Sequence, residues 1–352
     1  MTWRIIMTVS KKIKLLQMKN VKNENTQWLW KNWLPLGKLT LLAGPAGVGK
    51  TTLLMDIAAT ISNGGTLPFQ SIYSNMCSVV IYSTEDDIET TLNPRLTACG
   101  ANTSNIYYIT GTLKKEDKLE YFDPTQDFKL IENCLIEDSN IKLIIIDPIV
   151  SVISGDMHKS NEVRKSLAIF VELAQKYNCA IVGITHFSKS NLPTASPVDK
   201  IIGSQAFTAF ARMVWIILVI NGKKILVRAK SNITRLKGAL VYEIEDFIVD
   251  ININTTRVKW TEYIESDYDE LLKYDSKENA IEKDSTISRA RLLILDYLSE
   301  EQVIESKKLE KFIIHTNKVS ESTYRRAIKL LKNESKIESI KKKEWFWRLI
   351  TE

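Results

Sequence analysis

Short apolar runs of strand length alternate with helix-like stretches through the first three quarters of the chain. The runs are Lys38–Ala43, Ser78–Ser83, Lys142–Asp147, Ala180–Thr185, Met213–Ile220 and Lys224–Ala229. They are almost continuous in Ile, Val and Leu, which is typical of strands that are buried on both faces. The pattern therefore predicts an α/β fold over residues 27–262, with a mostly parallel sheet covered by helices.

The last 90 residues follow a different pattern. Residues 263–285 are acidic and polar, which predicts a linker with about one helical turn. Apolar positions at helical spacing then predict two amphipathic helices, Ser288–Leu298 and Ser306–His315, and Ser320 caps a third. The tail alternates as a two-stranded hairpin does. Three helices and a hairpin predict a small winged helix-turn-helix domain over residues 286–352.

The charge is unevenly distributed along the chain. The net charge is +6, but residues 1–30 carry +5, residues 306–352 carry +7 and the residues between carry −6. An acidic body with two basic ends indicates contacts to a polyanion, although solvated surface lysines would give the same count. Residues 1–26 are lysine- and asparagine-rich and are expected to form a flexible basic arm.

Nothing in the sequence predicts a membrane span or a zinc site. The longest apolar run has eight residues, whereas a helix needs about 18 or more to cross a bilayer. The four cysteines lie far apart and form no C-x-x-C pair. We therefore expect a cytoplasmic protein with reduced cysteines.

A glycine-rich loop follows the first of these strands and leads into a helix. It has the pattern G-x-x-x-x-G-K-[ST], and its residues are Gly44, Pro45, Ala46, Gly47, Val48, Gly49, Lys50, Thr51 and Thr52. Such a loop wraps backbone N–H groups around phosphates, while its lysine reaches the β and γ phosphates and its hydroxyl ligates Mg²⁺. The loop predicts binding of ATP with Mg²⁺.

Two further strands end in carboxylates. Asp147 follows four apolar residues, at the position where nucleoside triphosphatases hold the metal ion. Glu85 follows another strand and could accept a proton from the attacking water. Capping of the next helix explains an acidic cluster there equally well. The residues alone leave these two roles of Glu85 open.

Together these segments resemble the RecA-fold ATPases, in particular the RepA-like replicative helicases of plasmids and phages, and more distantly the DnaB helicases. The resemblance covers about 220 residues. The matching segments are WLPLGK, GPAGVGKTT, YSTEDD, IIIDPIVSVISGD, VGITHFSKS, and IIGSQAFTAFARMVW followed by VRAKSN. It implies an ATP hydrolase that forms a hexamer around single-stranded DNA.

The resemblance also assigns roles to residues. It implies that Glu85 is the catalytic base, that Arg95 lies near the adenine and that His186 senses the γ phosphate. The loop after His186 matches the one that grips single-stranded DNA in the central channel, with Lys189 and Lys200 as phosphate contacts. A solvated loop is the alternative for this segment.

In helicase relatives a lysine and an arginine near the end of a late strand reach the ATP of the neighbouring subunit. Lys230 matches the lysine, but Asn232 stands at the position of the arginine. This departure leaves Arg228, Arg235 and Arg212 as candidates. A cation there would stabilise the charge that develops on the γ-phosphoryl oxygens.

The third helix of the C-terminal domain resembles a recognition helix, and the hairpin resembles a wing. Such a helix enters the major groove of duplex DNA while the wing contacts phosphates. The candidate DNA contacts are Thr323, Arg325, Arg326, Lys329, Lys341, Lys342 and Lys343. The sequence thus favours a hexameric replicative DNA helicase of a mobile element. The alternatives are a DNA-bound regulatory or remodelling ATPase, and a recombination or signalling ATPase whose winged helix binds protein.

Overall fold

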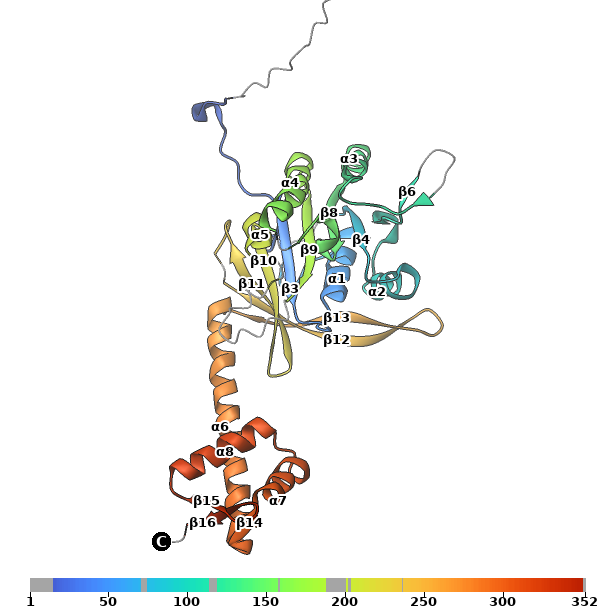
Figure 1. Ribbon diagram of the computed structural model, residues 1–352. Helices are drawn as coiled ribbons and strands as arrows, with labels where there is room; N and C mark the ends of the chain where they lie inside the picture. The colour runs from blue at the N-terminus through green and yellow to red at the C-terminus, as the bar shows by residue number, and fades with distance from the viewer. Residues whose placement is uncertain are drawn as a thin grey trace, which may run out of the picture. The chain divides into compact units, whose positions relative to one another are not determined.

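Figure 1 shows a computed structural model of the protein, which describes residues 15–70, 75–113, 119–157, 159–187, 201, 204–235 and 237–350. Contacts between Cα atoms divide the chain into two compact units, Met1–Asp267 and Tyr268–Glu352. Each unit has its own buried apolar core. Within the described residues, no helix is both long and apolar enough to cross a membrane.

The first unit is built around a nine-stranded sheet. In spatial order its strands are β13 (Ile253–Ile264), β12 (Ala239–Val249), β11 (Lys223–Ser231), β10 (Met213–Ile220), β3 (Leu39–Gly44), β9 (Ala180–His186), β8 (Ile141–Asp147), β4 (Ser78–Ser83) and β5 (Ile106–Tyr108). The six strands from β10 to β5 run parallel, whereas β11, β12 and β13 extend the sheet as antiparallel strands. The predicted α/β fold with a mostly parallel sheet is confirmed.

Helices cover both faces of this sheet. The helices are α1 (Lys50–Ser62), α2 (Asn93–Ala98), α3 (Phe128–Glu137), α4 (Ser160–Tyr177) and α5 (Ser204–Phe210). One core cluster joins α1 and α2 to alternate residues of the parallel strands, such as Leu42, Leu143 and Val182. Because successive residues of a strand point to opposite faces, the residues between them are buried on the other face, where α4 contacts β3 and β9.

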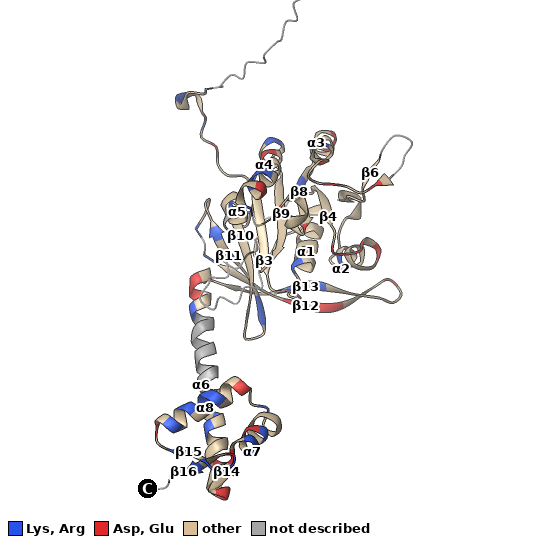
Figure 2. Ribbon diagram, in the orientation of Figure 1, with Lys and Arg blue, Asp and Glu red and all other residues tan. Residues whose placement is uncertain are grey.

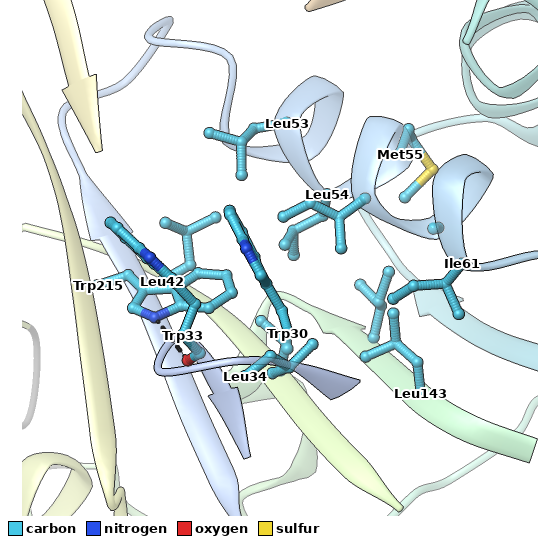
Figure 3. Close-up of a cluster of buried hydrophobic side chains, with 14 of the residues drawn as sticks. Trp30, Trp33, Leu34, Leu42, Leu53, Leu54, Met55, Ile61, Leu143 and Trp215 are labelled. Atoms are coloured by element: carbon cyan, nitrogen blue, oxygen red, sulfur yellow. Dashed lines mark hydrogen bonds between the residues drawn. The ribbon is translucent and has the colours of Figure 1, made fainter. Parts of the chain in front are cut away.

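Tryptophans tie the segment before the glycine-rich loop to this core (Figure 3). The segment holds the short paired strands β1 (Trp28–Trp30) and β2 (Leu34–Pro35). Trp30 stacks on Trp33 at 5.1 Å and meets Trp215 of β10 edge-on at 5.8 Å, and the Trp215 indole donates a hydrogen bond to the Trp33 carbonyl oxygen. A second strand pair, β6 (Thr112–Leu113) with β7 (Leu119–Glu120), lies beside β5 in sequence.

The second unit contains a long helix, two further helices and a small sheet. The elements are α6 (Tyr268–Glu301), β14 (Val303–Glu305), α7 (Ser306–Lys311), α8 (Glu321–Asn333), β15 (Ile337–Lys341) and β16 (Trp345–Leu349). The sheet has the antiparallel order β14-β16-β15. Buried residues of every one of these helices share one core, including Leu298, Leu309 and Leu331.

The predicted linker is wrong in its conformation. The structure continues α6 through residues 268–285, where the sequence predicted about one helical turn. The segment is polar, but it contains no glycine or proline, and half of its residues are Glu, Lys, Leu or Ala, which are strong helix formers. The scarcity of apolar residues argues against a buried segment, but a polar segment can still form a helix. The boundaries predicted for the domains stay a prediction.

Candidate nucleotide-binding site

The glycine-rich loop lies between the end of β3 and the start of α1 (Figure 1). Gly47 and Gly49 have φ angles of +74° and +88°, a backbone conformation that residues with a Cβ rarely adopt. A Cβ on Gly49 would also lie 2.8 Å from Cδ1 of Ile244. The loop therefore requires glycine at position 49 twice over, for its dihedral angle and for its packing. The N-terminal end of α1 adds the positive end of a helix dipole, which favours an anion.

Lys50 turns back over this loop. Its Nζ donates to the carbonyl oxygens of Gly44 at 3.2 Å and Pro45 at 2.9 Å, and it lies 3.2 Å from Nδ1 of His186. Burial lowers the pKa of Lys50, while the charges of Asp147 and Glu85 raise it. The ammonium is thus held where the motif requires it, at the centre of the loop.

Asp147 meets the hydroxyl of Thr51. The strand β8 ends at Asp147, and the Thr51 hydroxyl donates to Oδ2 of this carboxylate at 2.8 Å. Asp147 is only 1% exposed. Burial raises its pKa to about 6, Glu85 and Asp86 contribute in the same direction, and the Thr51 hydrogen bond and Lys50 oppose them.

This pair fits Mg²⁺. Among the described residues the buried Oδ1 of Asp147 has no hydrogen-bond partner. Magnesium takes one or two protein oxygens and completes its shell with water and substrate phosphates, so a hydroxyl beside a carboxylate suits it. No group of three His, Cys, Asp or Glu in the described part of the chain could hold a metal by itself. A metal at this site would therefore depend on phosphate oxygens as well as on Thr51 and Asp147.

The structure brings Glu85 and His186 to the same edge of the sheet. Because the strands are parallel, their carboxyl ends align: Gly44 pairs with His186, and Ser83 pairs with Asp147. His186 Nε2 lies 3.5 Å from Oε1 of Glu85, while its Nδ1 faces Lys50. The hydroxyl of Ser83 accepts from the backbone N–H groups of Glu85 and Asp86 in the turn after β4, and Asp87 caps the helix that follows by accepting from the N–H of Thr90. The capping of this helix therefore comes from Asp87, and the Glu85 carboxylate remains half-exposed.

The AAA domain family matches residues 12–191 of this chain. The chain belongs to this family. The prediction of a P-loop ATPase is confirmed, and the more specific helicase assignment stays a prediction. The chain is also similar to the crystal structure of the RadB recombinase, with 17% sequence identity and a TM-score of 0.41, over 60% of this chain and 89% of that one. No curated protein sequence matches the chain.

A cavity of about 430 Å³ opens beside the P-loop of this AAA domain. Lys50, Thr51, Glu85 and His186 line it, and so does Arg95, which forms an ion pair with Asp86 at 2.9 Å. Arg95 is thus placed at the cavity by a carboxylate from the same acidic cluster. Its predicted contact with adenine stays a prediction.

The antiparallel strands supply residues to the AAA domain site that no sequence motif predicted. Lys224 of β11, Ile244 of β12 and Thr256 of β13 line the same cavity. The hydroxyl of Tyr242 donates to the Val48 carbonyl oxygen of the P-loop at 3.0 Å. These residues follow the P-loop by about 170 to 210 positions and match no motif, so only the pairing of β10 to β13 could have revealed them.

Arg228 packs inside its own unit, and its predicted role toward a neighbouring subunit stays a prediction. Arg228 is 4% exposed, its guanidinium lies 4.6 Å from the ring centre of Trp33, and it donates to the Asn32 carbonyl oxygen. These contacts hold the guanidinium against the segment before the P-loop in its own unit. Arg212 and Arg235 are exposed, and Lys230, which donates to the Thr208 carbonyl oxygen, is partly exposed.

The second unit presents most of the predicted DNA contacts at its surface. Ser320 caps α8 by accepting from the N–H of Thr323, and basic residues recur along this helix (Figure 2). Among the predicted contacts, the exposed cations are Arg325, Arg326, Lys329, Lys341, Lys342 and Lys343. Arg325 forms an ion pair with Glu321, one turn earlier. Lys189 and Lys200 lie outside the described residues.

Proposed function

We propose that this AAA domain protein hydrolyses ATP in the cavity beside its P-loop. The energy of hydrolysis would drive a change in bound DNA. The observation that carries the first part is the arrangement at the edge of the sheet. There Thr51 bonds to Asp147, and His186 contacts both Lys50 and Glu85. These five side chains come from the P-loop and from the ends of adjacent strands.

The residues divide the chemistry between them. Backbone N–H groups of the P-loop and the Lys50 ammonium bind the β and γ phosphates of ATP. Thr51 and Asp147 would hold Mg²⁺, which supplies Lewis-acid stabilisation of charge on the phosphate oxygens. Glu85 accepts a proton as water attacks the γ phosphorus, and the bond to ADP breaks to release phosphate. Lys50 balances the negative charge that spreads over the transferred group.

The second unit supports a role on DNA. Its elements follow the order helix, strand, helix, helix and two-stranded hairpin, which is the order of a winged helix-turn-helix. In that fold α8 is the recognition helix and the β15–β16 hairpin is the wing. Residues 306–352 carry 13 basic and six acidic residues, as expected for a surface that binds phosphates. We infer that this unit binds duplex DNA.

The most specific form of the proposal is a hexameric, RepA-like replicative helicase of a plasmid, phage or other mobile element. In this form single-stranded DNA passes through a central channel and contacts Lys189 and Lys200. Lys230, with Arg212 or Arg235, would reach the ATP of the next subunit. Each subunit already has Lys50 at its own P-loop, so the exposed cations near the end of β11 are not needed there. In a ring they would lie close to the ATP of the next subunit.

A forked substrate tests this form directly. The helicase proposal expects ATP hydrolysis that single-stranded DNA stimulates, and ATP-dependent displacement of the shorter strand. Mass photometry with ATP and single-stranded DNA should show a species of six subunits. Strong ATPase activity without displacement would favour a regulatory or remodelling ATPase. An ATPase that neither binds nor responds to DNA would favour a signalling ATPase whose C-terminal unit binds protein.

A further inference from the structure

The tip of the β15–β16 hairpin combines lysines with an exposed tryptophan. Lys341 ends β15, and Trp345 begins β16 and pairs with it. The Lys341 ammonium lies 5.6 Å from the centre of the Trp345 ring. Trp345 is 53% exposed, so about half of a large aromatic surface faces solvent beside this cation.

Packing of the second unit does not explain this exposed ring. Trp345 and Trp347 lie on one face of β16, because alternate residues of a strand point the same way. Trp347 packs against the core of the unit and donates its indole N–H to the hydroxyl of Ser306 at 3.1 Å. Trp347 therefore anchors the hairpin to the helices. Trp345, two residues nearer the tip, is not among the described residues that pack against that core.

The charges around Trp345 select the kind of ligand. Lys341, Lys342 and Lys343 are exposed, and the one carboxylate of the turn, Glu344, lies 3.9 Å from Lys307. A cationic surface favours a polyanion, and a half-exposed indole offers a flat face for stacking. Single-stranded nucleic acids combine phosphates with free base faces, whereas the bases inside a continuous duplex are already stacked on one another.

We propose that Trp345 stacks on an unpaired base while the neighbouring lysines bind its phosphates. The protein then binds a junction between duplex and single strand more tightly than a continuous duplex. In this arrangement α8 lies in the major groove of the duplex, and the hairpin tip contacts the first unpaired nucleotides. This inference rests on the proposed binding of DNA by the second unit and adds the kind of DNA structure that the unit prefers.

Binding of labelled DNA to the full chain tests the inference. The probes are a blunt duplex, the same duplex with two unpaired arms, and a single strand, each followed by fluorescence anisotropy. Stacking on an aromatic side chain contributes about 1–3 kcal/mol per base, so Trp345→Ala should weaken fork binding by about 5- to 150-fold. Binding to the blunt duplex should change by less than about twofold. Trp345→Phe should recover part of the fork affinity.

Salt dependence separates stacking from phosphate contacts. Trp345→Ala removes no charge, so the slope of log affinity against log salt for the fork should stay as in the wild type. Lys343→Ala should reduce that slope by about one. Tyr121→Ala removes a 74% exposed aromatic ring from the other unit and is the matched control, which should bind like the wild type. Thermal unfolding checks that each variant is folded.

Three outcomes would overturn the inference. In the first, Trp345→Ala binds the fork as tightly as the wild type does. In the second, it loses fork and blunt-duplex binding equally, which assigns Trp345 to general packing of the hairpin. In the third, the wild type binds none of the three probes, and then the proposed DNA role of the second unit fails as well.

Discussion

His186 lies between two charged side chains, Lys50 and Glu85, in the small space beside the P-loop. The Lys50 ammonium can only donate, so Nδ1 of His186, 3.2 Å away, must be the acceptor. A neutral imidazole then carries its proton on Nε2, which faces the Glu85 carboxylate at 3.5 Å. His186 therefore separates the lysine that binds phosphate from the carboxylate that we propose as base. It contacts the Glu85 carboxylate on one side and the Lys50 ammonium on the other.

This arrangement predicts a separation of binding from turnover. Glu85→Gln keeps the size of the side chain but removes its basicity, so kcat should fall by about 10²- to 10⁴-fold while ATP still binds. Steady-state hydrolysis and the binding of a fluorescent ATP analogue measure the two effects. Glu89→Gln, at an exposed position four residues later, is the control. Loss of nucleotide binding in Glu85→Gln would instead make Glu85 a structural residue.

Substitution of Arg228 and of Lys230, two residues apart, should affect the stability of the protein differently. Arg228→Ala removes a buried guanidinium that stacks on Trp33 and bonds to Asn32, and it should lower the free energy of unfolding by about 2 kcal/mol. Lys230→Ala should leave stability near the wild-type value. Denaturant unfolding of both variants measures the difference. Equal stability of the two variants would contradict the packing role of Arg228.

The sequence could not show that Arg228 and Lys230 have different environments, because the difference comes from an irregularity in the pairing of β11. Lys230 pairs with Val214 and Arg228 pairs with Trp215, so the register between β10 and β11 shifts by one residue between them. Such a bulge changes which face each side chain takes, and no local signal in RAKSN marks it. The P-loop, Thr51 and Asp147 could be predicted because their positions follow from one loop and the end of one strand.

The hairpin of β12 and β13 attaches to the P-loop and α1 through two neighbouring aromatic residues. Tyr242 and Trp260 are cross-strand partners with ring centres 5.6 Å apart. Tyr242 bonds to the Val48 carbonyl oxygen, and the Trp260 indole donates to the Asp56 carboxylate of α1 at 2.7 Å. One pair of residues thus fixes both the loop and the helix that follows it.

Asp56 makes this attachment sensitive to pH. Burial raises its pKa to about 6, although the Trp260 hydrogen bond opposes the shift. Since the folded state binds this proton more tightly than the unfolded state does, the stabilising contribution is present below about pH 4 and is lost as pH rises through about 6. Asp56→Asn keeps an acceptor for Trp260 without the charge.

The variant Asp56→Asn should therefore be more stable than the wild type at pH 8, by at most about 3 kcal/mol, and should lose that advantage toward pH 4. Thermal unfolding at several pH values measures the difference. Asp250→Asn, at an exposed position in the loop of the same hairpin, is the control and should show no such trend. A wild type that is as stable as Asp56→Asn at pH 8 would contradict the burial cost of Asp56.

At the scale of the whole molecule, the sequence predicted the parallel part of the sheet better than its antiparallel extension. Parallel strands buried on both faces give continuous apolar runs, which is why β3, β4, β8 and β9 were recognised. β12 and β13 are half-exposed and polar, so no such run marks them. Their contribution to the cavity depends on pairing across the sheet, which the sequence does not state.

The proposed ring makes a prediction about mixed assemblies. Lys50→Ala subunits should be inactive because they cannot hold the γ phosphate, and Lys230→Ala subunits should be inactive because their neighbours lack a cation. Mixing the two should restore part of the ATPase activity, since a Lys230→Ala subunit can receive the intact Lys230 of a Lys50→Ala neighbour. Assemblies of each variant alone serve as controls. Failure to recover activity in stable mixed assemblies would contradict action of Lys230 on the next subunit.

The attachment of Tyr242 and Trp260 has a consequence for how this hairpin can change by mutation or engineering. A residue inserted between Ala239 and Tyr242, or between Trp260 and Ile264, would turn one aromatic ring to the opposite face and release the P-loop or α1. An insertion at the exposed turn around Ile251, which is 91% exposed, would leave both hydrogen bonds intact. The turn is thus the permissive position for a fluorescent label or a peptide tag, and the base of the hairpin is not.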